Sequence, residues 1–110
     1  MPRFIFSACY TSDAIKGMLA KPSDREAATR AIVEAAGGKL VAYYITTGSK
    51  DFLMIVDIDD VKDLMAGVMV AGASGAITNP ETIRAFSSAE FNEVQKRAQG
   101  LASAYKAPGS

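Results

Sequence analysis

The sequence predicts an α+β fold in which the elements follow one another as β-α-β-β-α-β, with one more helix at the C-terminus. Two observations lead to this prediction. The segment 38–59 holds two runs rich in β-branched, aromatic and other apolar residues around the turn Gly48-Ser49-Lys50-Asp51, which is typical of a β-hairpin. Helix-capping patterns, each followed by apolar residues at helical spacing, lie before and after this hairpin.

The N-terminal third supplies one strand and two helical segments. Arg3–Tyr10 alternates its aromatic residues on one face, as a strand does. A cap at Thr11-Ser12-Asp13 begins a short helix that ends at Ala20, before Lys21-Pro22. The spacing of Ser23 and Glu26 predicts a capping box for the next helix, which Gly37-Gly38 ends.

After the hairpin, the sequence predicts a helix, a strand and a last helix. The acidic run 57–60 caps a helix that carries the clearest amphipathic stripe of the chain, formed by Val61, Leu64, Met65, Val68 and Met69. A strand lies within 75–86, and Asn79-Pro80 marks it as an edge strand or a bulged one. A capping box at 87–90 begins the C-terminal helix, whose apolar stripe is Phe91, Val94, Ala98 and Leu101.

This order of elements, with right-handed crossovers, predicts a ferredoxin-like sandwich with the sheet order 4-1-3-2. The third strand is then central, which suits Phe52–Val56 because every residue there is apolar and both faces need cover. The connecting helices cover one face. Either the C-terminal helix or a second subunit covers the other, and we expect a second sheet, giving a dimeric α/β-barrel type of assembly or a larger homo-oligomer.

Composition excludes several classes of protein. Lysines plus arginines and aspartates plus glutamates both number 12, and this neutral balance argues against a nucleic-acid partner. No apolar run is long enough for a membrane span, and the N-terminus resembles a strand more than a signal peptide. Cys9 is the single cysteine and there is no histidine. We therefore expect a cytoplasmic protein without a cofactor or a metal, in which Asp57, Asp59 and Asp60 serve as helix caps.

The chain is expected to form a single domain over residues 1–106, followed by a flexible tail at 107–110. Its Ala-Pro-Gly-Ser composition has the character of a frayed end.

Several short segments, in this order and spacing, resemble the GYD-domain family of small ferredoxin-like proteins. They are Tyr10-Thr11, Ile15-Lys16-Gly17-Met18-Leu19, Gly37-Gly38-Lys39-Leu40, Gly48-Ser49-Lys50-Asp51, Ile55-Val56-Asp57 and Thr82-Ile83-Arg84-Ala85-Phe86. The resemblance extends from Arg3 to about Lys96 and implies the fold and oligomerisation, with no settled activity. The family is named for Gly-Tyr-Asp in the hairpin turn. Here Gly48 and Asp51 match while Lys50 replaces the tyrosine, so an aromatic contact made there in relatives would be absent.

Candidate ligand-binding residues lie near the end of the first strand and near the hairpin turn. The hypothesis places a site where Tyr10, Tyr44, Lys50 and Asp51 converge, and adds Lys16 and Arg84, the charged residues shared with the family pattern. For each of them a structural role is the simpler interpretation: turn capping for Asp51, a solvated turn for Lys50, and an ion pair with Asp51 or Asp57 for Arg84. Tyr43 and Tyr44 must lie on opposite faces of their strand.

Three classes of function follow. The preferred one is a small oligomer that binds a small ligand, an anionic one included, in a regulatory or carrier role. The second is a cofactor-independent monooxygenase or isomerase with a pocket between sheet and helices, which leaves catalysis open. The third is a structural assembly subunit whose interface is fully packed.

Overall fold

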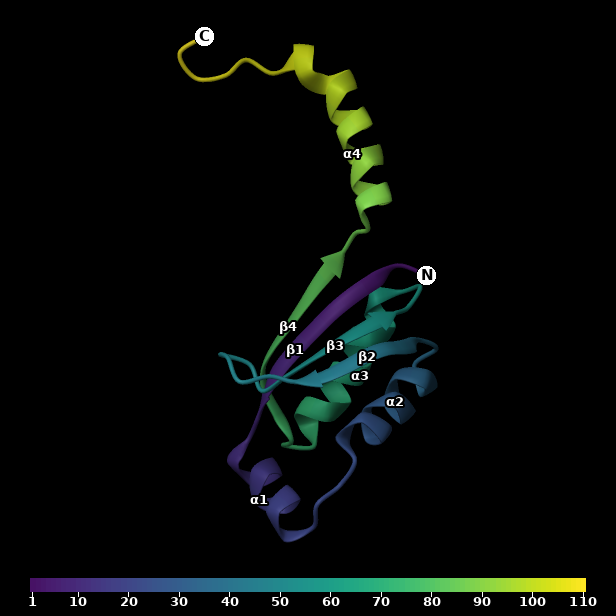
Figure 1. Cartoon of the computed structure of the whole chain (residues 1–110), viewed down its shortest axis with the longest axis vertical. Coiled ribbons are helices and arrows are strands. Elements are labelled where there is room, and N and C mark those ends of the chain that lie inside the picture. The colour runs from purple at the N-terminus through teal and green to yellow at the C-terminus, as the bar shows by residue number, and fades with distance from the viewer.

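The computed structural model describes all 110 residues and contains one four-stranded antiparallel sheet (Figure 1). Its strands are β1 (Arg3–Tyr10), β2 (Lys39–Ile45), β3 (Phe52–Asp57) and β4 (Ile77–Ala85). They lie in the order β2-β3-β1-β4, which is 4-1-3-2 when read from the other edge. The apolar strand β3 is therefore an inner strand, as its sequence requires.

The helices are α1 (Ser12–Ala20), α2 (Arg25–Ala35), α3 (Val61–Ala73) and α4 (Ser88–Leu101), and a short 3-10 turn, η1, follows at Ala102–Ala104. Helices α2 and α3 cover one face of the sheet, while α1 lies beyond one end of it and α4 projects away from the other (Figure 1). The projection of α4 explains a longest extent of 62 Å and a radius of gyration of 18.2 Å. A compact domain of this length has a radius of gyration of about 13 Å. No helix combines the length and the apolar character that crossing a membrane requires.

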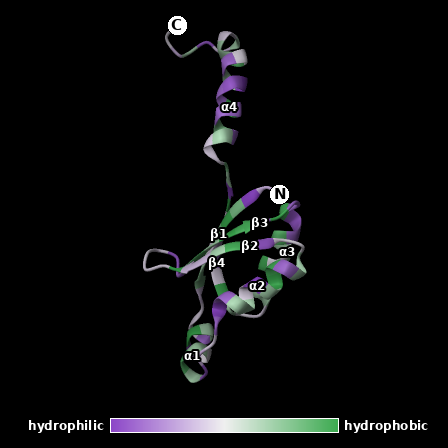
Figure 2. Cartoon of the chain, turned by 45° about the vertical axis from the view of Figure 1, so that its right-hand side comes forward, coloured by the Kyte–Doolittle hydropathy of each residue, from purple (hydrophilic) through white to green (hydrophobic).

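The core lies between the sheet and the helices α2 and α3. Alternate residues of the inner strands point into it, and the strands are accordingly among the most apolar parts of the chain (Figure 2). Burial along β3 alternates residue by residue, with Phe52, Met54 and Val56 buried and the residues between them half-buried. The remaining core residues are Phe4, Phe6, Ala8, Val33, Leu40, Ile58 and Leu64.

Most of the expected helix caps are present, but two expectations are wrong. Of Asp57, Asp59 and Asp60, only Asp60 caps α3, because the carboxylate of Asp57 accepts two hydrogen bonds from Arg3 and that of Asp59 lies 4.0 Å from the N-terminal amine of Met1. Thr11 caps α1, Asp60 caps α3, and Ser87 with Glu90 forms a complete capping box on α4. The capping box expected at Ser23 and Glu26 is wrong, because the carboxylate of Asp24 accepts the backbone N–H of Ala27 at 3.1 Å. An aspartate next to a serine competes for the cap position, and here it starts the helix one residue later.

Two neighbouring glycines end α2 for different reasons. Gly37 has a φ of 87°, the left-handed conformation that commonly follows a helix. Gly38 has no such backbone, but a Cβ there would lie 3.1 Å from the carbonyl oxygen of Asp57 and 3.2 Å from a side-chain carbon of Ile58. The first glycine turns the chain, and the second lets the start of β2 approach the end of β3.

Strand β4 is both an edge strand and an irregular one. Its pairing with β1 shifts register between Ser7 and Cys9, next to Asn79, which has a φ of 55°. Pro80 has no N–H to donate, so an edge position with a bulge accommodates it.

The second face of the sheet has no cover within the chain. It presents Ile5, Leu53 and Ile55 from the inner strands, all half-buried. The outer strands add three exposed residues, Val41, Tyr44 and Ile83. We call this surface the open face. Helix α4, one of the two covers considered from the sequence, lies away from it (Figure 1).

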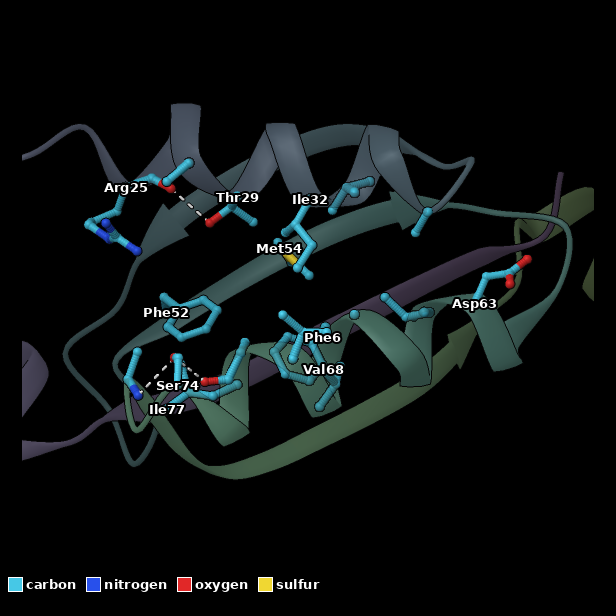
Figure 3. A pocket seen from close by; sticks show the side chains of 18 of the residues that line it. Phe6, Arg25, Thr29, Ile32, Phe52, Met54, Asp63, Val68, Ser74 and Ile77 are labelled. Atoms are coloured by element: carbon cyan, nitrogen blue, oxygen red, sulfur yellow. Dashed lines mark hydrogen bonds between the residues drawn. The ribbon is translucent and has the colours of Figure 1, made fainter.

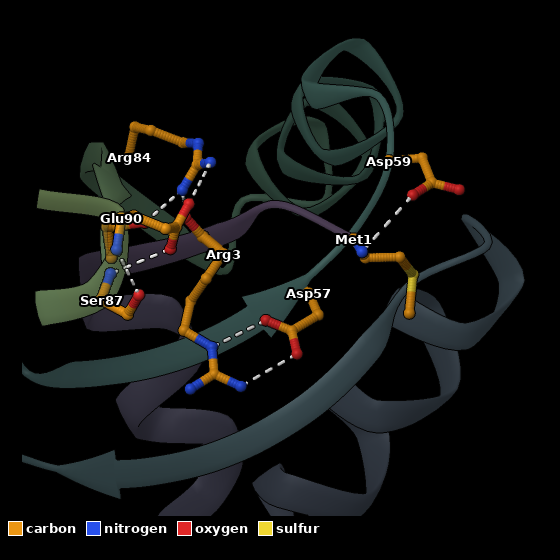
Figure 4. Close-up of polar contacts among 8 residues, drawn as sticks. Met1, Arg3, Asp57, Asp59, Arg84, Ser87 and Glu90 are labelled. Carbon is orange, nitrogen blue, oxygen red and sulfur yellow. Dashed lines mark hydrogen bonds and ion pairs between the residues drawn. The ribbon is translucent and has the colours of Figure 1, made fainter. Parts of the chain in front are cut away.

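Polar contacts fix the end of the sheet from which α4 departs (Figure 4). Arg3 donates two hydrogen bonds to Asp57, at 2.8 and 3.0 Å. This contact lowers the pKa of the Asp57 carboxyl below its usual range. Arg84 pairs with Glu90 at 3.5 Å and stacks on Phe86 with its guanidinium carbon 4.2 Å from the ring centre. The first contact joins β1 to β3, and the Arg84–Glu90 pair joins the end of β4 to the first turn of α4.

The buried face of α3 provides a test of the packing. Leu64→Ala removes the only buried side chain of α3 and should lower the free energy of unfolding by about 2–4 kcal/mol. Met65→Ala changes the next residue, which is 55% exposed, and should stay within about 0.5 kcal/mol of the parent. Urea unfolding of both variants measures the difference, and equal losses would contradict this placement of α3.

Candidate functional site

A cavity of about 280 Å³ lies between α2, α3 and the face of the sheet that these helices cover (Figure 3). This volume is near the lower end of the roughly 300–1,000 Å³ usual for small-molecule sites. Most lining side chains are apolar, and they come from both helices, the inner strands and the start of β4; among them are Phe6, Ile32, Phe52, Met54, Val68 and Ile77. The arrangement can hold an apolar molecule of modest size.

Aromatic rings form one end of this cavity. The ring of Phe52 lies between those of Tyr10 and Tyr43, with centre-to-centre distances of 5.0 and 5.7 Å. The hydroxyl groups of the two tyrosines form a short hydrogen bond with each other. Two phenols carry two hydrogens and their mutual bond uses one, so the other remains available to an acceptor.

The environment of the tyrosine pair keeps Tyr43 protonated. Burial raises the pKa of Tyr43 far above its usual range, and the hydrogen bond with Tyr10 raises it further. The positive charge of Arg25 and a contact with Thr29 oppose this shift. At neutral pH, Tyr43 is therefore a hydrogen-bonding group and not a general base.

Contacts at the end of β1 position Tyr10. The carboxylate of Asp51 accepts the backbone N–H of Tyr10 at 2.8 Å, which ties the hairpin turn to β1. The next N–H, that of Thr11, donates to the carbonyl of Ala76 at 3.1 Å, which ties the same end to β4. Hydrogen bonds from these two backbone N–H groups thus fix the backbone from which the ring of Tyr10 projects.

Polar side chains are few and lie at the ends of the cavity. Arg25 and Thr29 of α2 and Ser74 beyond α3 lie around the aromatic end, whereas Asp63 lies at the opposite end (Figure 3). Arg25 and Tyr10 also line a neighbouring depression, together with Lys21 and residues of α1. The aromatic end of the cavity is therefore the cationic end.

The residues expected from the sequence to form a site are not gathered in one place. Tyr10 is the only one of the six that lines the cavity. Lys16 is exposed on α1. Tyr44 is 59% exposed on the open face, opposite Leu53, whereas Tyr43 pairs with Met54 on the helix-covered face. The expectation that the two tyrosines lie on opposite faces is confirmed.

The charged members of that set make structural contacts. Lys50 donates to the carbonyl of Asn79 at 2.6 Å and lies 3.9 Å from Glu81. Arg84 lies farther along β4, where it donates to the carbonyl of Arg3. Its acidic partner is Glu90, so the expectation of Asp51 or Asp57 is wrong. Each of those carboxylates is engaged elsewhere, with Tyr10 and with Arg3.

Sequence reasoning missed Arg25 and Thr29, which line the cavity, and Tyr43, which does not line it but bonds to Tyr10. The hairpin held a signal for Tyr43. Phe52 and Met54 point to the buried face, and a residue that pairs with Met54, as Tyr43 does, points to the same face. The bulge in β2 between Leu40 and Ala42 hides this relation, since it breaks simple alternation from Leu40 onward. Arg25 and Thr29 lie one helical turn apart, and nothing in the sequence showed which way that face of α2 points.

Comparisons with known proteins give a family and a fold. The model of the GYD domain matches residues 4–94. A solved structure from Thermus thermophilus is similar with a TM-score of 0.50 and 20% identity, covering 80% of this chain and 96% of that one. A transcriptional regulator from Neisseria meningitidis, in complex with L-Met, is similar with a TM-score of 0.51 and 12% identity, covering 79% of this chain and 51% of that one. No curated protein matches. At these identities the structural likeness shows the fold alone.

The tyrosine pair gives a prediction for alkaline pH. Because the folded-state pKa of Tyr43 is raised, its contribution to stability is full below the pKa of an unfolded tyrosine, about 10, and is lost as the pH rises toward the folded-state value. An absorbance titration of the phenols should show a late step that Tyr43→Phe removes. Tyr44→Phe, which changes an exposed ring, should leave that step unchanged. A late step that survives in Tyr43→Phe would refute the assignment.

Proposed function

Because the chain belongs to the GYD-domain family, we propose that it is a homo-oligomeric domain that binds a small molecule between α2, α3 and the sheet, in a regulatory or carrier role. The observation that carries the proposal is the apolar cavity with a hydrogen-bonding tyrosine pair at one end. Cavities of this kind, apolar with a few polar groups that converge, are the usual form of small-molecule sites. We propose the cytoplasm as its location.

One relative of the same fold supports a regulatory role. The Neisseria meningitidis regulator was solved in complex with L-Met, so a protein containing this fold combines regulation with a small ligand. Fold alone does not carry function, and the cavity of this chain remains the principal support.

The open face supports the oligomer. Ile5, Ile55 and Ile83 lie opposite one another across β1, β3 and β4, and Leu53 and Tyr44 continue the apolar surface toward β2. In the proposed assembly, two ferredoxin-like sheets pack face to face as a dimeric α/β-barrel. Isologous packing would place each apolar row against its equivalent in the second copy.

The two alternative functions are distinguished by the cavity. A cofactor-independent enzyme would use this same pocket, but Tyr43 holds its proton and does not serve as the base at neutral pH. A purely structural subunit needs no cavity, and roughly 280 Å³ of apolar space would only weaken its packing. Ligand binding therefore accounts for more of the structure than either alternative.

Filling the cavity tests the ligand site. Ala71→Leu adds apolar volume to the wall that α3 contributes, and it should abolish binding of small aromatic and aliphatic compounds detected by ligand-observed NMR. Ala66→Leu makes the same change at an exposed position of α3 outside the cavity, and should leave binding unchanged. Equal binding to the two variants would reject the cavity as the site. Absence of binding to the parent protein and to both variants would reject it as well.

A charge on the open face tests the oligomer. Ile55→Lys places an ammonium group at the centre of the proposed interface and should convert the assembly to monomers in sedimentation velocity experiments. Met69→Lys introduces the same charge on α3, where the side chain is 75% exposed, and should preserve the oligomer. A monomeric parent protein would overturn this part of the proposal.

A further inference from the structure

The cavity has a charge asymmetry that points to the class of ligand. Arg25 lies at one end, beside Phe52, and Asp63 lies at the other (Figure 3). Tyr10, which also lines the cavity, and Tyr43, which is bonded to it, lie on either side of the Phe52 ring. Between them the lining is almost entirely apolar. A ligand that matches these features has one acidic group and an apolar body.

Arg25 lacks an internal partner for its charge. It takes part in none of the ion pairs of the structure. Its only side-chain hydrogen bond is a long one to the hydroxyl of Ser23, at 3.4 Å. Arg30, on the same helix, bonds instead to Glu26 and to the carbonyl of Leu40. A half-buried arginine at the mouth of an apolar cavity, without a carboxylate, is suited to receive one from outside.

The tyrosine pair adds a neutral donor to this cation. Because Tyr43 keeps its proton, the Tyr10–Tyr43 pair retains one hydroxyl hydrogen beyond their mutual bond. Arg25 acts on Tyr43 electrostatically, so the guanidinium and the phenols serve the same end of the cavity. Lys21 lines the adjoining depression and increases the positive charge there.

We propose that the cavity binds a monocarboxylic acid, with the carboxylate held by Arg25 and the Tyr10–Tyr43 pair and an aromatic or short aliphatic body between α2 and α3. The faces of Phe6 and Phe52 favour an aromatic body. An apolar cavity of ~150 Å³ holds a benzene molecule, so about 280 Å³ suits a ring with a short chain or a medium-length chain. Asp63 repels a second acidic group at the far end. This inference rests on the proposed function and names its ligand class.

The test uses matched pairs of acid and amide. 4-Phenylbutyrate and octanoate are titrated into the full chain at neutral pH, in parallel with 4-phenylbutyramide and octanamide, by isothermal calorimetry and by NMR of the methyl groups that line the cavity. The acids should bind about tenfold more tightly than their amides. Shifts should appear at Ile32, Val68 and Ile77, which line the cavity, and not at Ile83, which lies on the open face.

The variant Arg25→Gln should reduce affinity for the acids by about tenfold and leave affinity for the amides unchanged. Arg97→Gln removes the same charge from α4, outside the cavity, and should have no effect. Thermal unfolding checks that Arg25→Gln remains folded, and a conservative Arg25→Lys variant should restore part of the affinity for the acids.

The outcomes separate this inference from the proposed function. Acids and amides that bind equally, with no effect of Arg25→Gln, would overturn the carboxylate site and leave a neutral-ligand cavity. Shifts confined to Ile83 and other residues of the open face would overturn the location. Failure of every compound to shift the cavity methyl groups would count against both proposals.

Discussion

The need to cover both faces of the central strand β3 is the constraint on which the rest of the structure depends. Every residue from Phe52 to Val56 is apolar, and consecutive side chains point to opposite faces of the sheet. Phe52, Met54 and Val56 are buried under α2 and α3, while Leu53 and Ile55 remain half-buried on the open face. The chain therefore covers only one of the two apolar faces of β3 by itself. The division of the sheet into a helix-covered face and an open face is already present in the residues of this strand.

The helix-covered face is itself incompletely filled. Helices α2 and α3 meet the sheet at its buried aromatic and aliphatic residues but leave a cavity between themselves. Small residues on the facing sides of the helices, including Ala28, Gly67 and Ala71, keep that space open. A Cβ added to Gly67 would meet only the side chain of Ile32, at 3.9 Å, which is an ordinary van der Waals distance. The space beside Gly67 is therefore not tightly packed. The helix-covered face thus combines unfilled space in its packing with an arginine that has no carboxylate partner, and the proposed ligand site rests on this combination.

Much of the fold could be predicted from the sequence, because strand alternation and helix caps are local signals. The strands, the sheet order and the edge position of Pro80 needed only periodicity and the chirality of crossovers. The Ser23 cap failed because two adjacent residues could each cap α2, and sequence does not rank them. Less of the candidate site could be predicted from the sequence. Only Tyr10 was found, because the rotation of α2 decides that Arg25 and Thr29 line the cavity, and the bulge in β2 decides that Tyr43, and not Tyr44, lies on the helix-covered face.

Helix α4 presents a second apolar surface that the chain leaves uncovered. It has 14 residues, and isolated helices of about 12–15 residues are only marginally stable in water. The capping box and the Arg84–Glu90 pair secure its first turn, but its apolar residues Phe91, Val94 and Leu101 are exposed. The open face and α4 are thus two apolar surfaces that the single chain leaves bare, and β4, which carries Ile83 of the open face, leads directly into α4. Caps stabilise the ends of a helix, while packing of an apolar face provides most helical stability in proteins. A second copy of the chain that covered the open face would come close to the base of α4, so a single association would cover the open face and bring a partner toward α4.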